Sequence, residues 1–205
     1  PQDVRTGCDG VRVGITKLFA DGALTTRTAA LKEPFVDTGT TGILMHSDEE
    51  LREYILGAHR AGWQIATHAI GDRAIETVLS LYEEAMQAYP RADVRHRVEH
   101  CMLLDDGLIA RLHALGAVAV IQPEFIARLG DAYRYGLGEE RAGRLNRVNS
   151  LLEAGVPVAF SSDCPVVPGA PLDGIRAAME RRTPLGVVLN ETERVDAMTA
   201  IRLYT

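Results

Sequence analysis

The chain has 205 residues, of which 46% are hydrophobic and 24% are charged, as is ordinary for a globular protein with a substantial core. The formal net charge of -6 argues against nucleic-acid binding, because phosphate recognition requires concentrated Lys and Arg. We see no signal peptide and no apolar run of about 18 residues, so we expect neither a membrane span nor a membrane partner.

The cysteines and the two ends of the chain carry further information. Cys8, Cys101 and Cys164 form a sparse, odd set, which favours a reducing, cytoplasmic compartment over a disulfide scaffold. The chain does not begin with Met, and it stops at "AIRLYT" in an apparently helical segment. We therefore expect it to be a piece of a longer protein.

The first part of the chain predicts a strand, a long loop and a helix. Residues 11–20 are rich in β-branched side chains and predict a strand. Residues 21–46 are polar and rich in turn-forming residues, and they predict a long loop of the kind that is often functional. Residues 47–62 predict a helix, because Ser47 and Glu50 have the spacing of a capping box.

Strands and helices then alternate along the rest of the chain. Strands are predicted over 63–69, 93–101, 117–125 and 157–163, and helices over 72–89, 105–115, a segment ending near "LLEAGV", and 172–182. Residues 125–145 are less regular. No linker rich in Gly, Ser or Pro and no shift in composition is visible, so residues 1–205 are expected to form one domain without an internal linker.

This alternation predicts an α/β fold, with a parallel sheet covered by helices. Two architectures are compatible with it, a doubly wound open sheet and a (β/α)8 barrel. No G-x-G-x-x-G fingerprint follows the first strand, which removes one support for a dinucleotide-binding fold.

Polar residues recur where four of the predicted strands end. They are Lys17, His68, His100 and Asp163. Because the carboxyl ends of parallel strands share one edge, where α/β proteins bind ligands, we expect these side chains to converge. Imidazole nitrogen and carboxylate oxygen suit zinc and similar divalent cations. Their spacing is not that of a short metal motif, so the prediction rests on strand-end position.

Each of these residues also has a purely structural interpretation. A lone strand-end His is more often packed or capping, and a strand Lys usually extends to water. An Asp before a helix is usually an N-cap, but a loop follows Asp163, which weakens that interpretation. The coincidence of four such residues at one edge favours the functional interpretation.

Four segments carry a family resemblance. They are "KLFADGALTTRTAAL", "THAIGDRAIETVLSLYEEA", "RVEHCMLLDDGLIARLHALGAVAVIQPEF" and "GVPVAFSSDCPVVPGAPLDGIRAAM". In this order they resemble amidohydrolase family 3 of the amidohydrolase superfamily, which includes YtcJ-like metal-dependent hydrolases and N-substituted formamide deformylase. The resemblance covers nearly all of residues 10–205, and "KLFADG" and "HAIGDRA" are its specific blocks.

The resemblance implies strands four to eight of a TIM-barrel metal-dependent hydrolase, an incomplete barrel, with one or two divalent metals, most readily zinc. Lys17 matches a strand-four lysine that bridges two metals when carboxylated. His68 and His100 match metal-binding histidines that end strands five and six. Asp163 matches the strand-eight aspartate, which binds metal and acts as general base toward the attacking water.

The loop after the first strand resembles the substrate-facing loop of this family. Asp21 and Arg27 are therefore expected to bind substrate, although a solvent-exposed Arg27 is at least as compatible with the sequence. Two departures from the family pattern stand out. Ser161 replaces a glycine beside the strand-eight aspartate, and no His-x-His pair, which binds the more buried metal in the family, occurs in this chain.

The remaining candidate ligands are assigned by strand alternation. His96 and His100 share a predicted strand and, by period-two alternation, one face, about 13 Å apart. His96 is therefore expected in the barrel interior or at the start of the strand, too far away to share a metal. Alternation directs Cys101 away from His100, and both Cys101 and Cys164 are interpreted as small buried hydrophobic residues.

We expect the whole protein to hydrolyse an amide, formamide or related C–N bond of a small-molecule substrate with metal-activated water. This chain alone is expected to bind metal weakly and to show little activity. Two alternatives remain: a non-catalytic metal- or ligand-binding α/β module, and another superfamily activity, such as a deaminase or a phosphotriesterase-like enzyme. Unpaired sheet edges favour a homo-oligomer.

Overall fold

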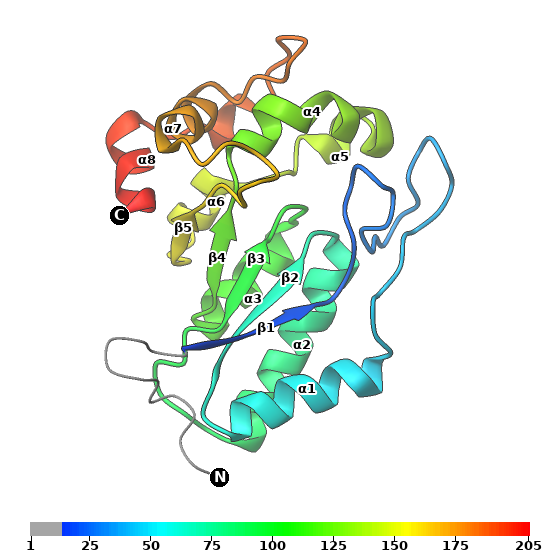
Figure 1. Cartoon of the computed structure of the whole chain (residues 1–205), viewed down its shortest axis with the longest axis vertical. Coiled ribbons are helices and arrows are strands. Elements are labelled where there is room, and N and C mark those ends of the chain that lie inside the picture. Colours follow the sequence, from blue (N-terminus) through cyan, green and yellow to red (C-terminus); the bar gives the residue numbers. More distant parts are fainter. Residues whose placement is uncertain (1–13) are drawn as a thin grey trace.

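A computed structural model describes residues 14–205, in which five parallel strands form one sheet (Figure 1). The strands are β1 (Ile15–Phe19), β2 (Gln64–Ala69), β3 (Arg97–His100), β4 (Val118–Ile121) and β5 (Val158–Phe160). They pair in chain order, each with the next. A doubly wound sheet reverses its order at a switch point, so the sequential order identifies successive units of a TIM barrel. The barrel is incomplete, because β1 and β5 are the edges of the sheet in the described part of the chain.

Two groups of helices can be placed relative to this sheet (Figure 1). The sheet is covered on one face by α1 (Asp48–Arg60), α2 (Asp72–Ala88) and α3 (Asp106–Leu115). Beyond the carboxyl ends of the strands lie α4 (Glu124–Leu137) and α5 (Glu139–Ala142). The chain continues through α6 (Val148–Glu153), α7 (Pro171–Glu180), the 3-10 helix η1 (Glu191–Glu193) and α8 (Ala197–Tyr204). Over residues 14–205, no helix is both long and apolar enough to cross a membrane.

The larger of two apolar cores lies between the sheet and the helices that cover it. Ile65 of β2 and Val98 of β3 point to this side and are fully buried with Ile55 of α1 and Leu79 of α2. Removing such side chains from water is the main stabilising contribution to the fold. A second core at the carboxyl ends of the strands joins the β1–α1 loop to α4, and it supports the candidate site.

A local sequence signal correctly predicted where α1 begins. Ser47 and Glu50 form both hydrogen bonds of the predicted capping box at the start of α1. The expectation that residues 125–145 are irregular was wrong, because α4 and α5 occupy most of them. Gly130 and Gly136 lower the helix propensity of α4. Its burial against the second core compensates for this. The first residues of the predicted strand 11–20 lie outside the described part of the chain.

Candidate active site

All four predicted metal-site residues line one cavity at the carboxyl ends of the strands. Lys17 and His68 come from β1 and β2, His100 ends β3, and Asp163 lies in the loop after β5. The cavity has a volume of about 350 Å³. The sequence therefore predicted correctly that these residues converge, whereas their roles as metal ligands and general base stay predictions.

Of these four residues, the two histidines contact each other directly. Their rings meet edge to face, with centroids 4.5 Å apart. The ring of Phe19 lies 5.2 Å from that of His68, and the ring of Phe125 stacks 6.0 Å from that of His100. The pair is thus held between two aromatic side chains, which limit the rotation of both imidazoles.

His100 reaches the cavity through an unusual backbone conformation. Val98 points to the helix-covered face, so regular alternation would send His100 to that face as well. Instead, His100 has φ +71° and Cys101 has φ +46°, two consecutive left-handed residues. This conformation is costly for side chains other than Gly, and such strain concentrates at functional sites. It turns His100 into the cavity and buries Cys101 in the main core.

Hydrogen bonds identify the protonated nitrogen on each ring. Nε2 of His68 lies 2.9 Å from the carbonyl oxygen of Gly22, which can only accept, so Nε2 carries the proton and Nδ1 the lone pair. Nδ1 of His100 lies 2.8 Å from Oε1 of Gln122. Both imidazoles have the form that a metal ligand needs, with one nitrogen donating and the other unprotonated.

Burial keeps these bases neutral at physiological pH. It lowers the pKa of His68, and it lowers the pKa of His100 to about 3, with a further contribution from the neighbouring His68. Burial also lowers the pKa of Lys17, although the negative charges of Glu99 and Asp163 act in the opposite direction. A lowered pKa raises the fraction of Lys17 present as the neutral amine.

Asp21 is buried at the base of the long loop, outside the cavity lining. Its carboxylate accepts hydrogen bonds from the backbone N–H groups of Ile70, Gly71 and Ala30, at 2.9 to 3.0 Å. Burial raises the pKa of Asp21 to about 7, while these donors act in the opposite direction. Through these hydrogen bonds, Asp21 joins the loop to the turn between β2 and α2. These contacts do not support substrate binding by Asp21, which stays a prediction.

Arg27 also holds the loop in place through contacts within the chain. Its guanidinium forms an ion pair with Asp37 at 2.7 Å and donates to the carbonyl oxygens of Leu24 and Ala132. Ala132 belongs to α4, so Arg27 joins the loop to this helix. Arg27 is not among the cavity-lining residues. Its predicted contact with substrate gains no support from these interactions.

Two expectations about neighbouring residues were wrong. His96 lies at the start of β3, as one expectation had it, but it does not share a face with His100: it contacts His59 of α1 and Tyr82 of α2, on the helix-covered side. The alternation rule failed because it assumes a regular strand, and the left-handed conformation of His100 interrupts the strand. Cys164 is exposed rather than buried, whereas Cys101 is buried as expected.

Sequence reasoning missed two features of the site. Gln122, buried directly after β4, contacts His100 and is a polar strand-end residue like the four that were selected. The second feature is an apolar wall, formed by Phe125, Leu129 and Tyr133 of α4. These three residues recur at a spacing of four, which is a helical signal inside the segment expected to be irregular.

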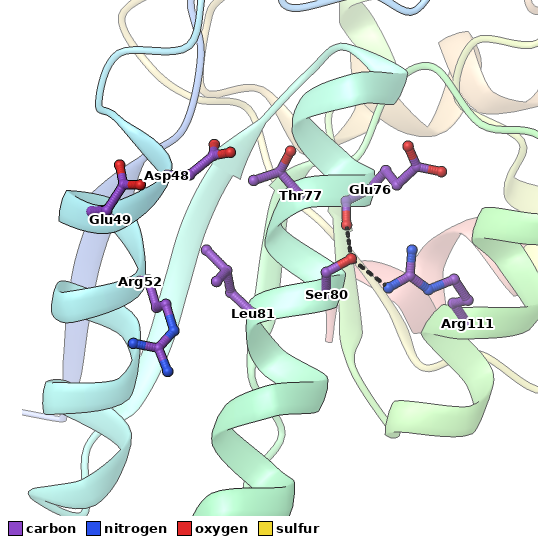
Figure 2. A pocket seen from close by; sticks show the side chains of 8 residues that line it. All are labelled: Asp48, Glu49, Arg52, Glu76, Thr77, Ser80, Leu81 and Arg111. Carbon is purple, nitrogen blue, oxygen red and sulfur yellow. Dashed lines mark hydrogen bonds between the residues drawn. The ribbon is translucent and has the colours of Figure 1, made fainter.

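A second hollow lies on the outer surface among α1, α2 and α3 (Figure 2). Both of its arginines have partners within the chain: Arg52 pairs with Glu84, and Arg111 with Glu83. The hydroxyl of Ser80 accepts a hydrogen bond from Arg111 and donates one to the backbone of α2 (Figure 2). These contacts are typical of a surface that joins helices, and we assign it no chemistry.

The donor types in the cavity suit a divalent metal, but they do not form a complete cage. Two neutral imidazoles and a carboxylate are ligands that zinc accepts. Within residues 14–205, no group of three or more His, Cys, Asp or Glu side chains is arranged to hold a metal ion. Lys17 becomes an oxygen donor only when it is carboxylated. The residues therefore fit part of a metal site.

Comparisons with known proteins agree with this placement. The amidohydrolase family model matches residues 2–205. YtcJ of Bacillus subtilis (strain 168), which carries the name of an amidohydrolase, is 38% identical over 200 residues, covering 95% of this chain and 37% of that protein. N-substituted formamide deformylase of Arthrobacter pascens is 31% identical over 202 residues, covering 95% of this chain and 36% of that protein.

A solved structure gives the same result. The crystal structure of an uncharacterized metal-dependent hydrolase from Pyrococcus furiosus matches with a TM-score of 0.83 and 34% sequence identity. The match covers 98% of this chain and 40% of that one. The chain thus spans well under half the length of each of these relatives.

Proposed function

The chain belongs to the amidohydrolase family, and from this we propose that it supplies strands four to eight of a metal-dependent hydrolase. The proposed reaction is hydrolysis of an amide, a formamide or a related C–N bond in a small molecule. The observation that carries the proposal is the convergence of Lys17, His68, His100 and Asp163 on one cavity. The name of the Arthrobacter pascens relative supports the choice of bond.

Each side chain has a chemical task in this proposal. His68 and His100 present neutral nitrogen lone pairs, and the carboxylate of Asp163 offers oxygen, as ligands for one or two divalent cations, with zinc the expected metal. A bound divalent metal lowers the pKa of water toward neutrality and polarises the scissile carbonyl. Asp163 accepts the proton of the attacking water and returns it to the leaving nitrogen.

Lys17 is proposed to be carboxylated at Nζ. An ammonium group repels cations, whereas a carbamate is anionic and binds them through oxygen. Carbamate formation requires the neutral amine, and the lowered pKa of Lys17 at the cavity wall is compatible with this requirement. Mass spectrometry under native conditions, with and without bicarbonate, detects the added carboxyl group.

The wall of α4 points to the substrate class. Phe125, Leu129 and Tyr133 present apolar surface to the same cavity as the polar residues of the strand ends. Burial of apolar substrate groups on such a wall contributes binding free energy in proportion to the area covered. We propose a substrate with an uncharged apolar substituent next to the C–N bond.

The metal test uses this chain directly. We expect zinc to bind weakly and below two ions per chain, because the described residues offer only part of a cage. Elemental analysis after dialysis, and zinc titration of the His68→Ala and His100→Ala variants, measure this binding. His113→Ala is the matched control, because His113 is an exposed histidine of α3. A stoichiometric two-metal site would contradict the incomplete cage, and unchanged binding in both site variants would contradict the ligand assignment.

The reaction is tested in the complete gene product with formamides, N-acyl amino acids and phosphotriesters. Hydrolysis of the first two classes supports the proposal, and hydrolysis of phosphotriesters alone favours the phosphotriesterase-like alternative. Ligand binding without turnover would favour a non-catalytic module. Self-association of this chain through the edges of its sheet, and a cytoplasmic location, are further proposals that rest on the sequence.

A further inference from the structure

Gln122 occupies a buried position between the ends of three strands. It follows β4 directly and precedes Pro123, the N-cap of α4, with only 2% of its surface exposed. Its side chain meets His100 at the end of β3 and Ser161 at the end of β5. A polar side chain buried to this extent is expected to have a defined set of hydrogen bonds.

The hydrogen bonds of Gln122 fix the orientation of its amide. Nε2 donates to the hydroxyl of Ser161 at 2.8 Å and makes a longer contact of 3.5 Å with the carbonyl oxygen of Val120. A carbonyl oxygen can only accept, so the amide NH₂ belongs on this side. Oε1 therefore faces His100, and a flipped amide would bring two oxygen atoms together at Val120.

This orientation determines the tautomer of His100. Oε1 of Gln122 is an acceptor, so Nδ1 of His100, 2.8 Å away, must carry the proton. In a neutral imidazole the other nitrogen, Nε2, then holds the lone pair. His100 lines the cavity, and Nε2 has no hydrogen-bond partner among the described residues. The free lone pair is thus the one available to a ligand.

Hydrogen bonds hold the backbone of Gln122 as well as its side chain. Asn146, which is buried, donates from Nδ2 to the backbone oxygen of Gln122 at 3.2 Å. Ser161 receives the amide NH₂ from the β5 side. Gln122 is therefore held at its backbone and at its amide, and it cannot turn without leaving buried polar groups unpaired, which is costly.

We propose that Gln122 is a positioning residue that fixes His100 as the Nδ1–H tautomer, so that Nε2 is available to bind a divalent cation in the cavity. Ser161 takes part by holding the amide of Gln122 in the required orientation. This inference rests on the proposed metal-dependent function, but its first consequence, the tautomer, exists in the metal-free protein.

The tautomer is measured by long-range ¹H–¹⁵N correlation spectra of the whole chain labelled with ¹⁵N-histidine, at a pH where His100 is neutral. We expect the wild-type protein to show Nδ1 protonated and Nε2 unprotonated. In Gln122→Leu, the population shifts toward Nε2–H, which neutral imidazole side chains prefer in water. Gln122→Glu retains an acceptor oxygen and is expected to preserve the wild-type tautomer.

Gln64→Leu is the matched control, because the amide of Gln64 donates to the Arg95 carbonyl at the opposite end of the sheet. It is expected to leave the His100 signals unchanged. Ser161→Ala removes the acceptor for the amide NH₂ and is expected to give an intermediate tautomer population.

A zinc titration of the same samples connects the tautomer to metal binding. The Nε2 signal of His100 is expected to move in the wild-type protein, and Gln122→Leu is expected to need about 10- to 100-fold more zinc for the same shift. A tautomer that does not respond to Gln122→Leu overturns the positioning role. A wild-type tautomer as expected, without any response to zinc, instead overturns the metal function on which the inference rests.

Discussion

Nε2 of His96 donates a hydrogen bond to Nδ1 of His59 over 2.8 Å, inside the core at the amino ends of the strands. The direction is fixed at both ends. The backbone N–H of Ile65 donates to Nδ1 of His96, and Nε2 of His59 donates to the carbonyl oxygen of Tyr89. Each ring uses one nitrogen as donor and the other as acceptor, so protonation of either ring breaks the chain.

This pair predicts a loss of stability in acid. Burial, followed by the charges of His59 and Arg91, lowers the pKa of His96 from 6.5 to about 4. The unfolded chain therefore takes up a proton first as the pH falls. The free energy of unfolding is expected to be highest above pH 6.5, to fall by up to about 3 kcal/mol as the pH approaches 4, and then to level off for this group.

Urea unfolding between pH 8 and pH 4 measures this loss. His96→Leu is expected to be less stable at pH 8 and less sensitive to pH, since one titrating group is gone. His113→Gln, at an exposed histidine, is expected to keep the wild-type profile. A wild-type free energy of unfolding that stays constant over this range would contradict the prediction without recourse to any variant.

Arg181 is predicted to be a large contributor to stability. It is 1% exposed and donates to the carbonyl oxygens of Leu189, Asn146 and Leu145, at 2.6 to 2.8 Å. Burial lowers its pKa to about 10, so it stays charged at neutral pH. Arg181→Met leaves the carbonyls of Leu189 and Leu145 without a donor, whereas that of Asn146 keeps the N–H of Val148, and the loss is expected to cost about 3 kcal/mol.

The neighbouring Arg182 provides a matched control for Arg181. Its guanidinium donates to the carbonyl of Gly186 in an exposed setting, so Arg182→Met is expected to change the free energy of unfolding by less than about 0.5 kcal/mol. If the two substitutions lower the free energy of unfolding in urea by the same amount, the buried contacts of Arg181 contribute no more to stability than the exposed contact of Arg182.

Asp21 is predicted to be structural. Asp21→Ala leaves three backbone N–H groups without their acceptor and is expected to lower the free energy of unfolding by about 3 kcal/mol. The β1–α1 loop is expected to become more sensitive to proteolysis than the helices. Asp37→Ala, which removes the partner of Arg27, is the milder comparison. The structural role fails if Asp21→Ala keeps wild-type stability and protection of the loop.

Among residues 14–205 the outer edge of β1 has no strand partner, which predicts concentration-dependent association. The N–H of Ala20 donates to His68 of β2, and donors alternate along a strand, so the N–H of Ile15 points to the open edge. Ile15→Pro removes this donor without breaking a bond to β2, and it is expected to reduce association. Ile15→Val is the control. Light scattering that shows a wild-type monomer at high concentration would refute the prediction.

The features that the sequence predicted depend on local signals or on strand ends. The capping box of α1 needs only Ser47 and Glu50, and both hydrogen bonds form. Lys17, His68, His100 and Asp163 converge because parallel strands share an edge, which requires no knowledge of distances. The family resemblance predicted the barrel, because the alternation of elements alone is also compatible with a doubly wound sheet.

The features that it did not predict depend on backbone conformation or on tertiary packing. The side of the sheet that His96 faces cannot be read from alternation with His100, because the left-handed conformation of His100 interrupts the alternation. The helix α4 contains two glycines, and its stability comes from packing over the cavity. Gln122 was missed because its importance lies in a hydrogen bond to another strand.

The left-handed turn at His100 and Cys101 also has a consequence for protein engineering. A regular strand carrying the same residues would direct the imidazole among the covering helices, where Val98 lies. Transplanting this site onto a designed barrel therefore requires copying two backbone conformations as well as the ligand identities. On a template built from ideal strands, the same imidazole would point to the helix-covered side of the sheet instead of into the cavity.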